Sequence, residues 1–267
     1  MPTPRLTELP DAALRLIEKA SGPIVDVGTV HAGLNSALAA RVQTSTDTLF
    51  VKGLPLDHPR VWTQKREADI SPYVQGIAPG LRWHLEADGW SLLGFQYAEG
   101  GHADFTPGSC DLPAVSAAMA QLARVPAPAV ELKAMEHRFR GYVDDPSDLS
   151  WFAGNSLLHT EWNPHNVLMT KAGARFVDWG WASTGAAWID PALWLLWLIA
   201  HGHTAVQAET EAATHPAWET APPAGLDALA RVQRRIWDAI ADANPDDWAK
   251  PMQAAARTWD EHRNARP

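Results

Sequence analysis

The sequence predicts an α+β fold in which a small strand-rich N-terminal part is followed by a larger, mainly helical part. Two patterns carry this prediction. Short apolar runs separated by turn residues dominate up to about residue 97, and apolar residues at helical spacing dominate after residue 110. With 267 residues, the chain is long enough for two unequal units or for one large domain.

The N-terminal part is predicted to be mainly antiparallel, with helices over 11–20 and 59–70. Each helix begins at or just after a proline, which the first turn of a helix tolerates. The predicted strands cover residues 24–27, 37–42, 48–52, 81–87 and 90–97. Asp88-Gly89 joins the last two strands, and this dipeptide favours a two-residue hairpin turn.

The C-terminal part is predicted to be helical on both sides of one hairpin. Apolar spacing predicts helices over 112–122, with Asp111 as its cap, and over 226–240. A last helix is expected over 246–265. The apolar run 191–200 is too short to span a bilayer and predicts a buried helix.

Composition narrows the setting in which the protein works. The chain has 31 Asp and Glu against 22 Lys and Arg, a formal charge of -9, whereas a nucleic-acid binder needs a basic face. Its single cysteine, Cys110, is typical of a reducing compartment, and the N-terminus lacks the apolar core of a signal peptide. We expect a cytoplasmic protein with no nucleic-acid or membrane partner; its oligomeric state is unknown from sequence.

Residues 157–180 contain the pattern that points to chemistry. Two apolar strands, 167–170 and 174–177, form a predicted hairpin, so Asn166 before the first and Asp178 after the second would meet at its open end. An amide oxygen and a carboxylate suit Mg²⁺. Glu161 lies on the loop entering this hairpin and could face a substrate hydroxyl. Each residue alone is more often a turn former, but their joint spacing favours a site.

The spacing resembles the H-x-D-x-x-x-x-N and D-x-G motifs of the aminoglycoside phosphotransferase family, whose fold is bilobal and protein-kinase-like. The matching residues are His159, Glu161, Asn166, Asp178 and Gly180. The local sequences HTEWNPHNVL and FVDWGW resemble the actinobacterial antibiotic-phosphotransferase branch of that family. The resemblance implies a nucleotide-binding lobe over 1–95, and a hinge with a catalytic and acceptor-binding lobe over 96–267.

The resemblance also implies ATP and Mg²⁺ as cofactors, and it assigns one residue to the ATP phosphates and one to support it. Lys52, at the end of a predicted strand, would hold the α and β phosphates. Glu67, in the helix that follows, would orient this lysine. The alternative for Glu67 is a glutamate on the solvated face of that helix.

Other parts of the nucleotide site are implied by position. Gly33 and Ser36 fall between the first two strands, where the family folds a loop over the phosphates. Gln96, Tyr97 and Ala98 lie in the predicted crossing between lobes, whose backbone groups would receive adenine.

Two departures from the family pattern affect the predicted mechanism. Glu161 replaces the catalytic aspartate and extends the carboxylate by one methylene; a displacement of about 1 Å can cost on the order of a hundredfold in rate. Because the base accepts its proton late in a loose transition state, we expect a kinase that is slower, or whose carboxylate is directed differently, and not an inactive one.

The second departure is Trp194, which stands where the family has a second acid. Asp190 either holds the catalytic loop or caps a helix, and His159 is expected to brace the loop.

The leading hypothesis is an ATP- and Mg²⁺-dependent O-phosphotransferase acting on a hydroxyl of a small natural product, with an antibiotic as the favoured acceptor, for resistance or self-protection. One alternative is a metabolic kinase for an amino alcohol or a sugar. A second is a catalytically impaired kinase-like binding protein. Retention of Lys52, Asn166 and Asp178 argues against the second.

The acceptor is not identified by the sequence. Asp104, Asp144, Asp145 and Asp148 could face a cationic acceptor. They could equally belong to solvated loops, and this is the favoured interpretation.

Overall fold

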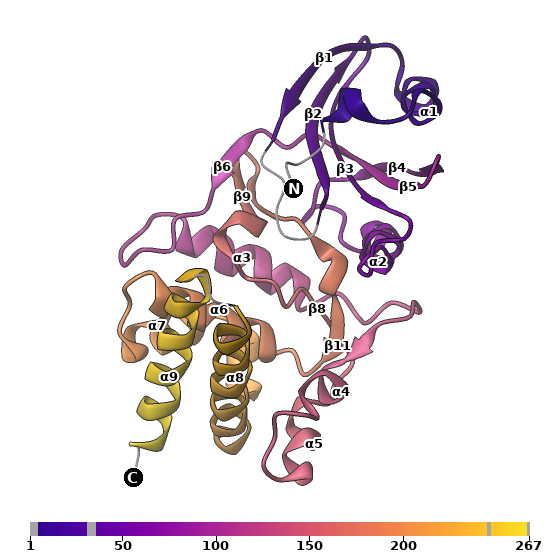
Figure 1. The fold of residues 1–267 in the computed structure, drawn as a ribbon. Coiled ribbons are helices and arrows are strands. Elements are labelled where there is room, and N and C mark those ends of the chain that lie inside the picture. The colour runs from indigo at the N-terminus through magenta and orange to yellow at the C-terminus, as the bar shows by residue number, and fades with distance from the viewer. Residues whose placement is uncertain (1–4, 31–35, 245–246, 266–267) are drawn as a thin grey trace. The chain divides into compact units, whose positions relative to one another are not determined.

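The computed structural model describes residues 5–30, 36–244 and 247–265, and the chain divides into two compact units (Figure 1). Unit 1 comprises Met1–Gly100 and Arg175–Trp181, and unit 2 comprises Gly101–Ala174 and Ala182–Pro267. The segment that contains Asp178 therefore belongs with the N-terminal sheet. The predicted α+β class is confirmed, with an antiparallel sheet in unit 1 and mostly helices in unit 2.

Unit 1 is built on an antiparallel sheet with the strand order β1-β2-β3-β5-β4 (Figure 1). Its strands are β1 (Ile24–Thr29), β2 (Leu38–Thr44), β3 (Thr48–Pro55), β4 (Leu81–Ala87) and β5 (Trp90–Gln96). The predicted strands are thus confirmed to within a few residues. Asp88 and Gly89 have φ angles of 44° and 81°, and two positive φ angles are what the predicted hairpin turn requires.

Strand β3 is central in this sheet and continues three residues beyond the end predicted at Lys52. It continues because its last residues still pair with β5. A Cβ on Gly53 would lie 2.5 Å from Leu92 Cδ2, so glycine allows this close pairing. Lys52 consequently lies inside the sheet, opposite Ala39 on one side and Leu93 on the other.

Two helices belong to unit 1. Helix α1 (Asp11–Ser21) buries Ala13 and Ile17, one turn apart, in the core cluster that includes β2 residues. It is followed by Gly22, whose φ of 86° favours glycine. Helix α2 (Trp62–Ile70) begins three residues later than predicted, since the residues before it form tight turns. The short 3-10 helices of this unit are η1 (Leu6–Glu8), η2 (Ser71–Tyr73) and η5 (Trp179–Trp181).

Unit 2 is mainly helical. Its helices are α3 (Leu112–Leu122), α4 (Met135–Phe139), α5 (Leu149–Phe152), α6 (Ile189–Ala200), α7 (Ala205–Ala212), α8 (Pro223–Ala243) and α9 (Lys250–Asn264). The 3-10 helices are η3 (Pro146–Asp148), η4 (Pro164–Asn166), η6 (Pro216–Thr220) and η7 (Asp247–Ala249).

Short strands complete the fold. Strands β7 (Lys133–Ala134), β8 (Ser156–Leu158) and β11 (Ser183–Gly185) form a sheet in the order β7-β11-β8. Strands β6 (Gly100–His102), β9 (Val167–Thr170) and β10 (Gly173–Phe176) form another in the order β10-β9-β6. The predicted hairpin is therefore present as β9 and β10.

The helices predicted over 112–122, 191–200 and 226–240 are confirmed. The last predicted helix, 246–265, is present as η7 followed by α9 from Lys250, and residue 246 lies outside the described residues. One capping prediction needs correction. The apolar run 191–200 lies in α6, most of which is buried. Within the described ranges, no helix is both long and apolar enough to cross a membrane. Asp111 precedes α3, but its side chain does not cap that helix; it accepts a hydrogen bond from the backbone N–H of Asp104 at 2.9 Å instead.

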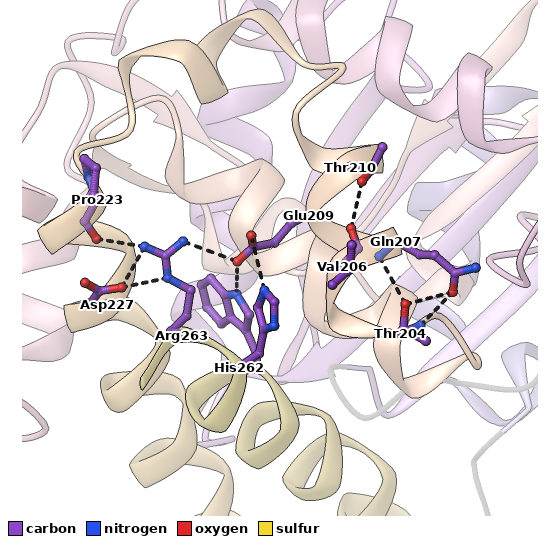
Figure 2. Close-up of polar contacts among 10 residues, drawn as sticks. Thr204, Val206, Gln207, Glu209, Thr210, Pro223, Asp227, His262 and Arg263 are labelled. Atoms are coloured by element: carbon purple, nitrogen blue, oxygen red, sulfur yellow. Dashed lines mark hydrogen bonds and ion pairs between the residues drawn. The ribbon is translucent and has the colours of Figure 1, made fainter. Parts of the chain in front are cut away.

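Two ion pairs that share one buried arginine join the three C-terminal helices (Figure 2). Arg263 of α9 is 6% exposed and donates to Glu209 of α7 at 3.4 Å and to Asp227 of α8 at 2.7 Å. Trp259 donates its indole N–H to the same glutamate at 3.0 Å. At the N-terminus of α7, the N-cap residue Thr204 accepts a hydrogen bond from the backbone N–H of Gln207 at 3.2 Å (Figure 2).

We expect Arg263→Met to lower the free energy of unfolding by about 3 kcal/mol, because it leaves the buried Glu209 carboxylate without its guanidinium partner. Urea denaturation, monitored by circular dichroism, measures this loss. Arg257→Met is the matched control, since Arg257 lies on the same helix and pairs with Asp238, but its side chain is 51% exposed. Its expected loss is below about 1 kcal/mol. Equal losses in the two variants would contradict the prediction.

Candidate active site

A buried charge cluster in unit 1 connects three of the residues singled out by the sequence. The ammonium of Lys52 lies 2.5 Å from Glu67 Oε2 and 3.1 Å from Asp178 Oδ1. Lys52 and Glu67 are 5% and 4% exposed. The interpretation of Glu67 as a solvated helix-face residue is therefore wrong, and its carboxylate is a direct partner of the lysine.

The charge state of Lys52 follows from these contacts. Burial by itself lowers the pKa of this ammonium, but the carboxylates of Asp178 and Glu67 together raise the pKa above its ordinary value. Lys52 is therefore a fixed cation at neutral pH. An always-protonated, buried ammonium suits the binding of phosphate oxygens.

Helix α2 packs directly against the segment that follows Asp178. A Cβ on Gly180 would lie 2.8 Å from Thr63 Cβ, so the glycine of D-x-G permits a close approach to the helix. Next to it, the Trp62 and Trp181 rings meet edge to face with centroids 5.0 Å apart, and the Arg66 guanidinium lies 4.7 Å from the Trp62 centroid. This packing fixes the D-x-G segment on the helix that carries Glu67.

In unit 2, Asp190 holds the loop that precedes Glu161. Its buried carboxylate accepts hydrogen bonds from the backbone N–H of His159 at 2.8 Å, the backbone N–H of Thr160 at 3.0 Å and the indole N–H of Trp162 at 2.8 Å. Of the two interpretations of Asp190, the loop-holding one is confirmed. Burial raises the pKa of Asp190 to about 6, although its hydrogen bonds and the nearby Arg138 oppose the rise.

The loop backbone is strained at Thr160. Its φ is 68°, a left-handed conformation that is rare for a β-branched residue and costs on the order of 1–3 kcal/mol. His159 is fully buried, and its Nδ1 accepts a hydrogen bond from the backbone N–H of Glu161 at 3.3 Å. The expected bracing role of His159 agrees with this contact.

Asn166 ends η4, five residues after Glu161. Its side-chain amide donates from Nδ2 to the Glu161 carbonyl oxygen at 3.1 Å. Because the NH₂ group makes this bond, the amide oxygen of Asn166 is the side-chain atom that remains as an acceptor or metal ligand. This orientation fits an oxygen-preferring cation such as Mg²⁺. Asn166 and Asp178 belong to different units, and their convergence on one cation stays a prediction.

The predicted adenine-binding segment begins at Gln96, the last residue of β5, and continues through Ala98. The backbone N–H groups of Gln96 and Tyr97 donate to Gly80 and Thr48 carbonyls at 2.8 and 3.1 Å, so sheet pairing already uses these two donors. The backbone N–H of Ala98 and the carbonyls of the segment are then the groups that remain to bind adenine.

The predicted phosphate loop is only partly described. Gly33 lies outside the described residues. Ser36 is described and half-buried, and it lies two positions before β2 begins.

The acidic residues considered for a cationic acceptor have local partners. Asp144 and Asp148 form ion pairs with arginines of α8. Asp104 and Asp145 accept backbone N–H bonds from residues two positions further along the chain. These contacts agree with the interpretation of the four residues as parts of surface loops.

Comparison with known proteins identifies the fold. No protein-family model and no curated protein matches the chain. Solved structures that match over most of its length include choline kinase LicA from Streptococcus pneumoniae, a thermostable mutant of aminoglycoside phosphotransferase APH(4)-Ia, and a putative fructosamine-3-kinase from Haemophilus somnus 129PT. The TM-scores are 0.61, 0.59 and 0.60, at identities of 12%, 15% and 12%.

The matches cover 92%, 92% and 93% of this chain, and 98%, 98% and 96% of the respective structures. The chain therefore has the protein-kinase-like fold that these three small-molecule kinases share. Another structure of LicA contains AMP, and another of APH(4)-Ia contains AMP-PNP and hygromycin B.

Sequence reasoning missed several residues that contact the candidate site. Arg138 of α4 donates to Thr160 Oγ1 at 2.9 Å, and no motif or periodicity marks it. The contact between Trp62 and Trp181 was also missed. The one signal for this contact in the sequence was Trp181, the tryptophan that directly follows D-x-G.

We expect the indole N–H resonance of Trp162 to titrate with a midpoint near the pKa of Asp190, about 6. Because this carboxyl has a raised pKa, the carboxylate that holds the loop is present above pH about 6 and is protonated below it. Two-dimensional ¹H–¹⁵N NMR measures the shift, with the resonance assigned through Trp162→Phe.

The Trp179 indole is the internal reference, because it donates to the Phe176 carbonyl, which does not titrate. If Asp190→Asn leaves the titration of Trp162 unchanged, another group is responsible and the prediction is wrong.

Proposed function

We propose that the protein is an ATP- and Mg²⁺-dependent O-phosphotransferase that phosphorylates a hydroxyl group of a small molecule. The observation that carries this proposal is the buried contact of Lys52 with both Glu67 and Asp178. It combines a permanent cation for phosphate oxygens with the carboxylate of a D-x-G motif. In this proposal residues 1–95 bind the nucleotide, and residues 96–267 supply the hinge, the base and the acceptor pocket.

In the proposed mechanism, each residue has a distinct task. Lys52 would hold the α and β phosphates of ATP, and Glu67 would keep its ammonium in place. Asn166 and Asp178 would hold Mg²⁺, which neutralises charge on the phosphates when bound. Glu161 would accept the proton of the acceptor hydroxyl. At the same time the hydroxyl oxygen would bond to the γ-phosphorus of ATP, and the bond between that phosphorus and the ADP oxygen would break.

A small hydroxylated natural product, in particular an antibiotic, is the proposed acceptor. The support is the motif resemblance together with a structural neighbour that contains hygromycin B. Two other neighbours are named as choline and fructosamine kinases, and they favour a second candidate, a kinase for an amino alcohol or a sugar. ATP consumption with aminoglycosides, peptide antibiotics, macrolides, nucleoside antibiotics, choline and sugars, with mass detection of a phosphate adduct, distinguishes the two.

We expect Lys52→Met to weaken binding of Mg²⁺-ATP at least tenfold by calorimetry, because the phosphates lose their buried cation. Lys65→Met is the matched control, since Lys65 is an exposed lysine of α2 paired with Asp69. Removing Lys52 takes the ammonium partner from both Glu67 and Asp178, so the melting temperature of each variant is measured as well. Tight nucleotide binding by a folded Lys52→Met variant would contradict the proposed role.

Glu161→Ala is expected to lower kcat by about 10²- to 10⁴-fold, because the proton of the acceptor hydroxyl loses its base. The KM for ATP should change little. Glu161→Asp shortens the side chain and tests how strictly the carboxylate is positioned. Steady-state kinetics with the acceptor found in the screen measures all three proteins.

Equal turnover by the wild type, Glu161→Asp and Glu161→Ala would show that Glu161 is not the base. Nucleotide binding without phosphate transfer to any acceptor would instead favour the impaired binding protein, above all if Glu161→Asp gained transfer.

A further inference from the structure

Arg138 connects two segments of unit 2 that flank the candidate chemistry. Its Nη1 donates to Thr160 Oγ1 at 2.9 Å and to Ser183 Oγ at 3.0 Å. Thr160 directly precedes Glu161. Ser183 is fully buried in β11, where it pairs with Leu158 of β8, the strand that leads into the loop. One guanidinium thus joins the loop to the sheet beside it.

Thr160 is fixed from both its backbone and its side chain. The backbone N–H donates to the buried Asp190 carboxylate, and the hydroxyl accepts from Arg138. Both hydrogen bonds involve a charged group, which makes them stronger than bonds between neutral groups. Arg138 also attracts the Asp190 carboxylate electrostatically. These contacts stabilise the left-handed backbone at residue 160, where φ is 68°.

The backbone conformation of residue 160 determines the direction in which the side chain of residue 161 leaves the backbone. A β-branched residue leaves this φ readily unless its surroundings hold it, because the extended and right-handed regions are less strained. A rotation at residue 160 would turn the Cα–Cβ bond of Glu161 and move its carboxylate. The Arg138 hydrogen bond opposes that rotation.

We propose that Arg138 and Thr160 are positioning residues that lock the loop backbone so that the Glu161 carboxylate meets the acceptor hydroxyl. The inference rests on the proposed function, since it takes Glu161 as the base. Neither residue has to touch the reacting atoms. The expected consequence is an effect on kcat rather than on nucleotide binding, because positioning of the base matters in the transfer step.

The test compares two ways of breaking one hydrogen bond in the full-length protein. Arg138→Met removes the donor, and Thr160→Val removes the acceptor while keeping the branched shape. Thr160→Ser restores the hydroxyl, and Arg140→Met is the matched control because Arg140 is an exposed arginine directly after the same helix. Hydrogen exchange by mass spectrometry follows a peptide over residues 157–163, and steady-state kinetics gives kcat and the KM for ATP.

We expect Arg138→Met and Thr160→Val to speed exchange of this peptide at least fivefold and to lower kcat at least tenfold, with the KM for ATP within twofold. Thr160→Ser should recover most of both losses relative to Thr160→Val, and Arg140→Met should match the wild type. If exchange and kcat stay within twofold in Arg138→Met and Thr160→Val, the proposal is overturned.

Other outcomes separate this inference from the proposed function. If the wild type binds no nucleotide but exchange rises in the two variants, the loop lock stands and the proposed function fails. If kcat falls while exchange is unchanged, Arg138 acts by some other route and the positioning role is rejected. If Arg138→Met raises exchange throughout the protein or greatly lowers its melting temperature, this variant is destabilised as a whole. The proposal is then tested by Thr160→Val, which keeps the guanidinium.

Discussion

The burial of the Lys52 ammonium is the constraint on which unit 1 depends. Removing an ion from water costs several kcal/mol in a protein even after relaxation, so the charge needs close partners. One partner, Glu67, comes from α2, and the other, Asp178, comes from the segment 175–181 that returns to this unit. The N-terminal sheet therefore holds its central cation only with help from a distant piece of chain.

A buried ion plays the corresponding part in unit 2. The Asp190 carboxylate, at the start of α6, is surrounded by three N–H donors from the loop at residues 159–162. In both units a charge inside the protein draws short, irregular backbone segments into a defined geometry. The sheet and the helices supply rigid supports, and the buried ions determine how the loops between them are placed.

Local signals in the sequence predicted most elements of the fold. Apolar alternation and Asp88-Gly89 gave the strands and one hairpin, and helical spacing gave α3 and α8. The predictions were wrong where strand pairing or a loop contact overrode the local preference. Gly53 and Pro55 remain in β3 because β5 pairs with them. The Asp111 side chain accepts a hydrogen bond from the backbone N–H of Asp104 instead of capping its helix.

Long-range contacts of the candidate site were harder to predict. Lys52 and Asp178 are 126 positions apart, and the motif resemblance alone suggested that both serve one nucleotide. Arg138 and Thr160 are 22 positions apart and belong to no motif. A single arginine in a short helix looks like many surface arginines, so its partner becomes evident only when the chain is folded.

The two unusual features of the loop, a strained threonine and a glutamate in the place of an aspartate, are adjacent in the chain and physically connected. Glutamate has one more rotatable bond than aspartate, so its carboxylate can occupy more positions for a given backbone, and ordering it costs more entropy. A backbone that also moved would add to that spread. The hydrogen bonds that hold Thr160 at a φ of 68° remove the backbone contribution. In the proposed mechanism, in which Glu161 is the base, only the side-chain torsions of Glu161 are then left to place its carboxylate.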